Sequence, residues 1–125
     1  MVETLLRPSH TSTGPAADGT AVVALRGEID IFVAPPLTAC LDDLTATGRP
    51  DLVVDLRAVS FIDCAGLRPL CRTQQRVMER QGRLRLVTNS DHLLRILRAA
   101  GLADAFEICD RLPDGLTPGP GQSLA

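Results

Sequence analysis

The 125-residue chain has very few aromatic side chains, with three Phe, no Trp and no Tyr. Proteins that bind single-stranded nucleic acid stack the bases on aromatic rings, so this composition disfavours that function. All thirteen basic residues are arginine, and fifteen acidic residues outnumber them. The resulting net charge of −2 argues against binding to a phosphate backbone. We therefore expect no nucleic-acid partner and a core built from Leu, Val, Ile and Ala.

Long apolar segments are also missing. No run approaches the roughly 18 residues that a membrane helix needs. The segment Met1–Pro8 has no apolar stretch typical of a signal peptide. These two observations predict a cytoplasmic chain that does not insert into a membrane.

Motifs for metals, cofactors and catalysis are not found either. The cysteines form no CxxC pair, and neither histidine neighbours one of them in the sequence: Cys40, Cys64, Cys71, Cys109, His10 and His92. This spacing disfavours zinc, and free thiols are expected in a reducing compartment. Gly-rich phosphate loops and GxSxG are absent. We expect no metal, no cofactor and no enzymatic activity; an enzyme would need a His and a Cys within hydrogen-bond reach.

Strand and helix patterns alternate along the chain, which predicts an α/β fold with a four- to five-stranded, mixed and largely parallel sheet. Strands are expected at 20–26, 51–56, 84–87 and 106–109, with a weak edge strand at 3–7 and a long turn at 9–19. Helices are expected after Pro35–Pro36, after Gly66, and after Asn89 or Ser90, the last ending at Gly101. We expect one domain over 1–112, followed by a flexible Pro- and Gly-rich tail at 113–125.

The segment 61–67 is the most informative part of the sequence. An apolar strand end runs through Asp63, small residues and Gly66 directly into an amphipathic helix. The first N–H groups of a helix have no partner within the helix, and the helix dipole is positive there, so such a site suits an anion or a side chain that gains one. A simple helix cap formed by Asp63 explains the same residues. Pro69 lacks a backbone N–H, which costs little only if this helix begins late, near Gly66, and we expect a tight or irregular helix start.

Three segments in this order resemble the STAS-domain family over about residues 20–110. They are Gly27–Asp30, Val53–Leu56 with Val59–Leu67, and Leu93–Ile108 with Ala100–Leu102. Within the family, the chain is most similar to bacterial anti-sigma factor antagonists. The resemblance implies the STAS fold and binding to an anti-sigma factor, often a kinase of the histidine-kinase-like ATPase fold. That binding frees a sigma factor for RNA polymerase, and phosphorylation of a Ser directly after the motif Asp weakens it.

At the phospho-acceptor position this chain has Cys64 instead of Ser, followed by Ala65. Three interpretations follow: an antagonist that is always competent to bind, a thiol redox switch, or an inert packed residue. The helix start favours a thiolate, whereas the neighbouring Asp63 opposes it. Ser60 and Thr38 are alternative acceptors.

The resemblance predicts that the partner contacts these residues: Asp30, Asp63, Cys64, Ala65, Gly66, Leu67 and Arg68. Arginines at every fourth position, 68, 72, 76 and 80, form a stripe that could meet an acidic partner or simply be solvated. The family usually has a further C-terminal helix, which Pro113, Pro118 and Pro120 discourage here. A homodimer is left open, and the alternative role is that of a cytoplasmic STAS subunit of a lipid-transporting ABC system.

Overall fold

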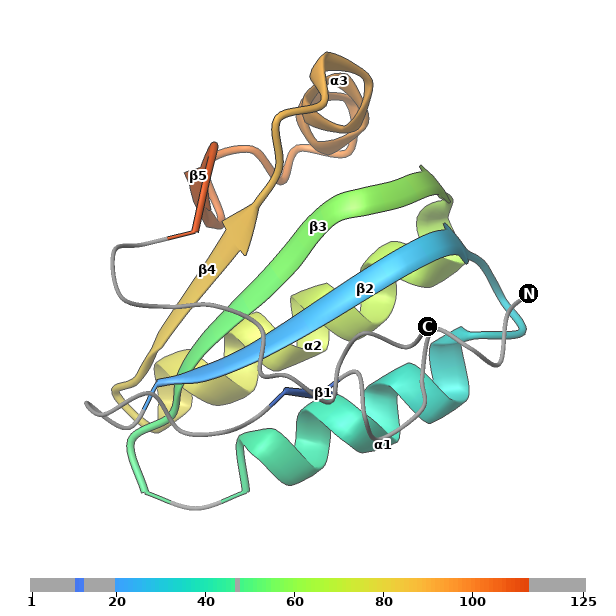
Figure 1. Ribbon diagram of the computed structural model, residues 1–125. Coiled ribbons are helices and arrows are strands. Elements are labelled where there is room, and N and C mark those ends of the chain that lie inside the picture. Colours follow the sequence, from blue (N-terminus) through green and yellow to red (C-terminus); the bar gives the residue numbers. More distant parts are fainter. Residues whose placement is uncertain (1–10, 13–19, 47, 113–125) are drawn as a thin grey trace.

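A computed structural model describes residues 11–12, 20–46 and 48–112. Five strands form one sheet in the order β1-β2-β3-β4-β5 (Figure 1). β1 is antiparallel to β2, and the other neighbouring strands are parallel, which confirms the predicted mixed, largely parallel sheet. The bounds are β1 Thr11–Ser12, β2 Ala21–Ile29, β3 Asp51–Ile62, β4 Arg83–Val87 and β5 Glu107–Cys109.

Three predictions concern the two ends of the chain. The expected long turn at 9–19 is wrong in part, because Thr11 and Ser12 pair with Val23 and Val22 as a short strand. The expected strand at 3–7 and the tail at 113–125 lie outside the described residues.

The helices are α1 Ala34–Leu44, α2 Cys64–Glu79 and α3 Asp91–Ala99. Helices α1 and α2 lie on one face of the sheet (Figure 1). Their apolar sides form one core with the inward residues of the strands, including Leu37, Leu41, Leu70, Val54 and Leu86. Among the described residues, no helix combines the length and the apolar character needed to cross a membrane.

An ionic clamp joins α1 to α2. The guanidinium of Arg72 donates from Nε and Nη2 to the Asp42 carboxylate at 3.1 and 3.0 Å. Arg76 donates to the Thr45 hydroxyl at 3.2 Å and to the Asp42 carbonyl at 3.3 Å. Two of the four arginines in the predicted stripe, Arg72 and Arg76, are therefore bound to α1, so these two are neither simply solvated nor free to meet a partner.

β3 is twice as long as predicted. The sequence indicated 51–56, but β3 continues to Ile62 because β2 pairs with it as far as Ile29. Asp55 lies inside this strand and is 6% exposed. Its carboxylate accepts two hydrogen bonds from the Arg57 guanidinium, at 2.9 and 2.8 Å. A local ion pair thus lets a charged residue occupy a buried strand position.

Both predicted ends of α3 are confirmed. The Ser90 hydroxyl accepts a hydrogen bond from the Leu93 N–H at 3.1 Å. Gly101 follows the helix with φ of 74°, a left-handed conformation in which glycine is favoured. The N–H of Leu102 then donates to the Leu97 carbonyl at 2.7 Å. This is a Schellman motif, and it turns the chain towards β5.

Candidate functional site

The candidate site lies where β2 and β3 end side by side. Ile29 and Ile62 are register partners at the last position of their strands. Directly after them, the Asp63 N–H donates to the Ile29 carbonyl at 3.3 Å. The chain continues into α1 from one strand and into α2 from the other (Figure 1). The two acidic residues that the sequence singled out, Asp30 and Asp63, therefore lie at the same sheet edge.

Asp30 organises the loop between β2 and α1. Its carbonyl accepts hydrogen bonds from the N–H groups of Val33 and Ala34, both at 3.0 Å. One carboxylate oxygen accepts from the Phe32 N–H, also at 3.0 Å. This local bonding holds the turn that leads into α1, whose first turn contains Pro35 and Pro36. Asp30 is only half-buried, so its carboxylate remains accessible.

Asp63 caps α2, as the sequence predicted. Its carboxylate accepts a hydrogen bond from the Gly66 N–H at 2.9 Å. The predicted late start near Gly66 is wrong, because α2 begins at Cys64 and encloses Pro69 in its second turn. The reason is the cap, which makes Gly66 the third residue of the helix. Pro69 then lies in the second turn, where it removes the hydrogen bond that would have reached the Ala65 carbonyl and its ring crowds that carbonyl.

Gly66 lets α2 approach the strand ends closely. A Cβ at this position would lie 2.4 Å from the Ile29 carbonyl oxygen and 2.9 Å from Ile62 Cγ1. Leu67, the next residue, is buried in the core. Of the predicted contact residues, Gly66 and Leu67 are thus buried and hold the start of α2 against the strands. Cys64 and Arg68 are exposed, and Asp30, Asp63 and Ala65 are half-buried.

This end of the sheet also carries an apolar component that was not predicted from the sequence. Phe32 is 78% exposed, Ile31 63% and Phe61 46%. Two of only three Phe in the chain are therefore exposed, next to Asp30 or Asp63. The signal was available, since a bulky apolar pair follows Asp30 and Phe61 lies two residues before Asp63. Exposed apolar side chains rimmed by polar ones are typical of protein-binding surfaces.

The four cysteines differ in accessibility. All are free thiols; Cys64 is exposed, and the other three are half-buried. Burial, with a smaller contribution from the charge of Asp43, raises the pKa of Cys40 to about 11. Burial also raises the pKa of Cys71. No group of three metal-ligating side chains occurs among residues 11–12, 20–46 and 48–112.

The alternative phospho-acceptors lie in different settings. Ser60 is exposed on β3. The Thr38 hydroxyl donates to the Ala34 carbonyl at 2.8 Å within α1 and is half-buried. Neither lies at the start of α2.

The comparisons with known proteins identify the family of this fold. Residues 14–115 match the STAS domain family. Over 109 residues the chain is 30% identical to the anti-sigma-F factor antagonist RsfB of Mycobacterium tuberculosis, covering 87% of this chain and 88% of that protein. It is 34% identical over 94 residues to the anti-sigma-B factor antagonist of Bacillus subtilis, covering 75% of this chain and 85% of that protein. A crystal structure of an anti-sigma factor antagonist from Mycobacterium paratuberculosis superposes with a TM-score of 0.71 and 31% identity, covering 89% of this chain and 95% of that one.

Proposed function

Since the chain belongs to the STAS domain family, we propose that it acts as an anti-sigma factor antagonist, which binds an anti-sigma factor and so releases a sigma factor for RNA polymerase. The similarity to antagonists extends over most of the chain, including the segment that carries the candidate site. The proposed role is binding without catalysis, in the cytoplasm, with neither nucleic acid nor cofactor.

One observation carries this proposal: an ordered edge surface that combines acidic, apolar and thiol groups. Asp30 and Asp63 lie beside each other through the bond between Asp63 and Ile29. Phe32 and Cys64 are exposed on the two segments that follow the strands. Exposed large apolar side chains are common anchors in protein interfaces, and acidic residues around them favour a partner with basic groups.

The proposed contact surface consists of the predicted residues in two roles. Side chains that reach the partner come from Asp30, Asp63, Cys64, Ala65 and Arg68, whereas Gly66 and Leu67 hold the start of α2 in place. We add Ile31, Phe32 and Phe61 as apolar contacts because of their exposure. The proposed partner is an anti-sigma factor of the histidine-kinase-like ATPase fold.

Cys64 sets the regulation that we propose. It is the first residue of α2, where a phosphoserine would place a doubly charged group beside Asp63 and repel a closely packed partner. A serine kinase does not phosphorylate a thiol in the ordinary way. The chain is therefore always competent to bind the anti-sigma factor, and the amount of the chain in the cell sets how much anti-sigma factor is bound. The redox alternative is supported by the exposure of the Cys64 thiol.

The test begins with capture of partners by tagged chain from the native cytoplasm, identification by mass spectrometry, and titration of the purified partner. Wild type is expected to bind an anti-sigma factor. The Cys64→Asp variant should bind at least tenfold more weakly, about 1.4 kcal/mol, because it adds a negative charge at the helix start. Cys64→Ala is the matched control: it removes the thiol without adding a charge, so it should lose much less affinity than Cys64→Asp. Equal binding by Cys64→Asp would remove the start of α2 from the contact surface.

Two further outcomes separate the alternatives. Capture of ABC transporter subunits instead of an anti-sigma factor would favour the subunit role. Loss of binding after treatment with hydrogen peroxide, in wild type but not in Cys64→Ala, would favour the redox switch. If the partner is a kinase, it should phosphorylate the Cys64→Ser variant and leave wild type unmodified.

A further inference from the structure

The outer side of α1 is unusually apolar for a helix at the protein surface. Its inner side carries Leu37 and Leu41, which are buried in the core. The positions on the opposite side are exposed, and all but the last are apolar: Pro35, Pro36, Ala39 and Asp43. A surface helix ordinarily places charged and polar side chains there.

Phe32 adds a large exposed side chain to this side of α1. It is 78% exposed. The Ala34 N–H donates to the Asp30 carbonyl at 3.0 Å, four residues back, so the helical turn extends to Phe32 although α1 begins at Ala34. Exposed apolar side chains gathered in this way mark a docking surface. We define this surface, the α1 patch, by four residues: Phe32, Pro35, Pro36 and Ala39.

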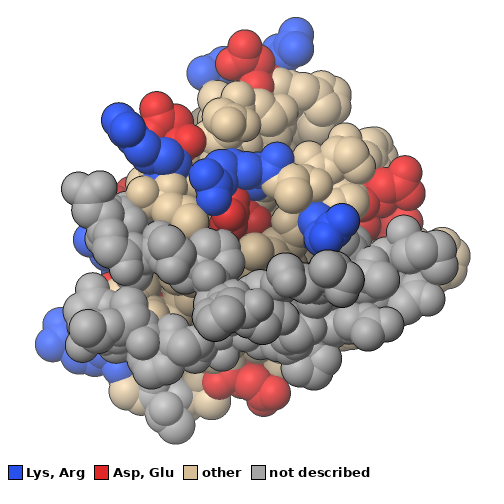
Figure 2. Space-filling model, viewed as in Figure 1, with Lys and Arg blue, Asp and Glu red and all other residues tan. Residues whose placement is uncertain are grey.

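Charged side chains are rare in this part of the chain. Residues 31–41 contain none, and residues 27–48 contain no basic one. On the face of the molecule in Figure 2, by contrast, arginines and acidic residues lie side by side over the described surface. A lipid surface matches the α1 patch poorly, because helices that lie on membranes carry Lys or Arg beside their apolar side chains. The patch therefore fits another protein surface.

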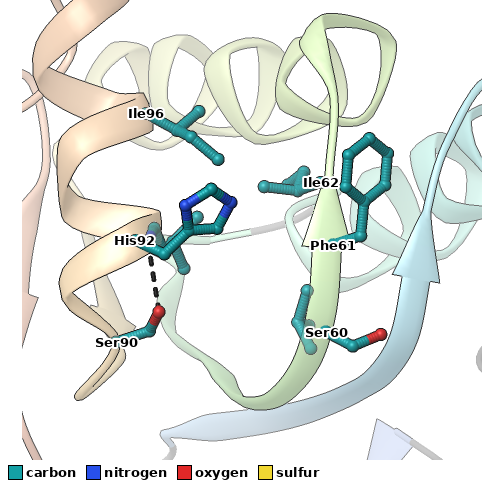
Figure 3. Close-up of a pocket in the computed structure, with 8 residues that line it drawn as sticks. Ser60, Phe61, Ile62, Ser90, His92 and Ile96 are labelled. Carbon is teal, nitrogen blue, oxygen red and sulfur yellow. Dashed lines mark hydrogen bonds between the residues drawn. The ribbon is translucent and has the colours of Figure 1, made fainter.

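The hollow between α3 and β3 offers no comparable surface. Figure 3 shows His92 and Ile96 facing Ile62 across it. Its free interior is about 20 Å³, which admits about one water molecule. A side chain of another protein does not fit inside it, whereas the α1 patch lies open on the outside of its helix.

The sequence around α1 is self-complementary about Ala39. Phe32 and Ala46 lie seven positions to either side of it, and Pro35 and Asp43 lie four positions to either side. When two copies of α1 pack antiparallel with a two-fold axis at Ala39, each residue of such a pair meets the other residue in the second copy. Phe32 then covers the exposed Ala46 of the second copy, and the small Ala39 lets the two helices approach closely.

Electrostatics favour the same arrangement. Asp43 is exposed and has no ion-pair partner among the residues that the structure describes. The first turn of α1 contains no acidic residue, and the partial positive charge of a helix N-terminus attracts a carboxylate. The antiparallel pair places Asp43 of each copy beside this turn in the other copy. The preceding acidic residue, Asp30, already uses one carboxylate oxygen for the Phe32 N–H.

We propose that the α1 patch binds the α1 patch of a second copy of this chain, in an antiparallel pair centred on Ala39. One helix face buries less than the roughly 1,200 Å² of a stable complex, so the dimer is weak and forms as the concentration rises. This inference does not depend on the proposed function. Where both hold, Phe32 is shared, and self-association competes with binding of the anti-sigma factor.

Sedimentation equilibrium of the full chain over a wide range of concentrations tests the dimer. Wild type is expected to shift from monomer to dimer. Phe32→Ser should raise the dissociation constant about tenfold through loss of an apolar anchor, and Asp43→Arg should raise it by placing a positive charge at the positive end of the second helix. Met78→Ser, at an exposed position of α2, is the matched control and should leave the constant unchanged. Urea unfolding verifies that the three variants are folded.

A disulfide tests the position of the axis. In a Cys64→Ser background, which removes the exposed thiol, Ala39→Cys should form a disulfide between two copies when diamide is added, because the two thiols meet at the axis. Gln75→Cys in the same background adds an exposed thiol to α2 and should form much less dimer on non-reducing electrophoresis.

The other outcomes are decisive as well. A chain that stays monomeric at every concentration overturns the proposal, and so does a dimer that Phe32→Ser and Asp43→Arg leave unchanged. A dimer weakened by Phe32→Ser, without a disulfide in Ala39→Cys, overturns the antiparallel arrangement. The proposed function stands in each of these cases, since it fails only if the chain binds no anti-sigma factor.

Discussion

A side chain at Gly66 would collide with Ile29, because the added Cβ would lie 2.4 Å from the Ile29 carbonyl oxygen. We expect Gly66→Ala to lower the free energy of unfolding by about 1–3 kcal/mol, as overpacking does, although alanine favours a helix by about 0.5–1 kcal/mol. Chemical denaturation measures the change. Cys64→Ala, an exposed substitution in the same turn, should leave stability unchanged. A Gly66→Ala chain as stable as wild type would show that the start of α2 can move away from β2.

Phe32 offers the most direct test of the apolar contacts. Because it is 78% exposed, Phe32→Ser should leave the free energy of unfolding within about 0.5 kcal/mol of wild type. If Phe32 anchors the partner, the same change should weaken binding by about 2 kcal/mol, measured by calorimetric titration. Met78→Ser is the matched control. Met78 is exposed as well, at 63%, but lies near the end of α2, away from the candidate site. Equal losses for the two variants would deny Phe32 a special role.

Asp51 neutralises a buried arginine. Its carboxylate accepts from Arg85 Nη2 at 3.0 Å and from the Thr20 hydroxyl at 3.0 Å, and Arg85 is only 8% exposed. Asp51→Ala should cost about 2 kcal/mol of stability, less than the 3–5 typical of a fully buried pair because Asp51 is partly exposed. Chemical denaturation again gives the value.

Two comparisons make that test specific. Glu107→Ala breaks the exposed ion pair with Arg83 and should cost less than about 1 kcal/mol. Adding Arg85→Met to Asp51→Ala should recover part of the loss, because no buried charge then remains unpaired. A double variant less stable than Asp51→Ala would show that the Arg85 side chain stabilises by packing and not through Asp51.

The clamp between α1 and α2 predicts a dependence on pH. Hydrogen bonds from Arg72, opposed in part by desolvation and aided by the charges of Arg72 and Arg76, hold the pKa of Asp42 below its ordinary value of 3.8. The clamp is therefore fully present above the ordinary aspartate value and is lost as the pH falls through the lowered pKa. Stability measured across this acidic range should fall less steeply for Asp42→Asn. Parallel curves for the two chains would contradict a role of Asp42 in acid sensitivity.

Thiol labelling separates Cys64 from the other cysteines. Iodoacetamide at neutral pH should modify Cys64 first, because Cys64 is exposed whereas burial raises the pKa of Cys40 to about 11. The rapid phase should disappear in Cys64→Ser, as followed by mass spectrometry. The denatured chain, in which all four thiols are accessible, provides the reference. A rapid phase that survives the substitution would assign the reactive thiol elsewhere.

Local signals predicted both ends of α3 correctly. Ser90 and Gly101 act through side-chain and backbone preferences of single residues, which can be read from the sequence. The extent of β3 could not be read in this way, because Arg57 and Ser60 indicate a connection and only the pairing with β2 makes this segment a strand. The close approach of Gly66 to Ile29 could not be read from the sequence either, because it joins parts of the chain far apart in sequence.

The candidate site was predicted only as a set of motif residues. Asp30 and Asp63 were identified, but their placement at one edge follows from the sheet topology. The exposure of Phe32 and Phe61 was not predicted, since apolar residues near a strand end are usually assigned to the core. The internal pairing of Arg72 with Asp42 depends on how two helices pack and leaves no local signal.

The hydrogen bond from Asp63 to Ile29 also bears on the entropy of association. It ties the loop after β2 to the start of α2, and the Asp30 carboxylate fixes the first of these segments internally. A partner that binds here meets a backbone whose conformations are already restricted before contact. Less conformational entropy is then lost on binding, so a modest number of side-chain contacts can give useful affinity.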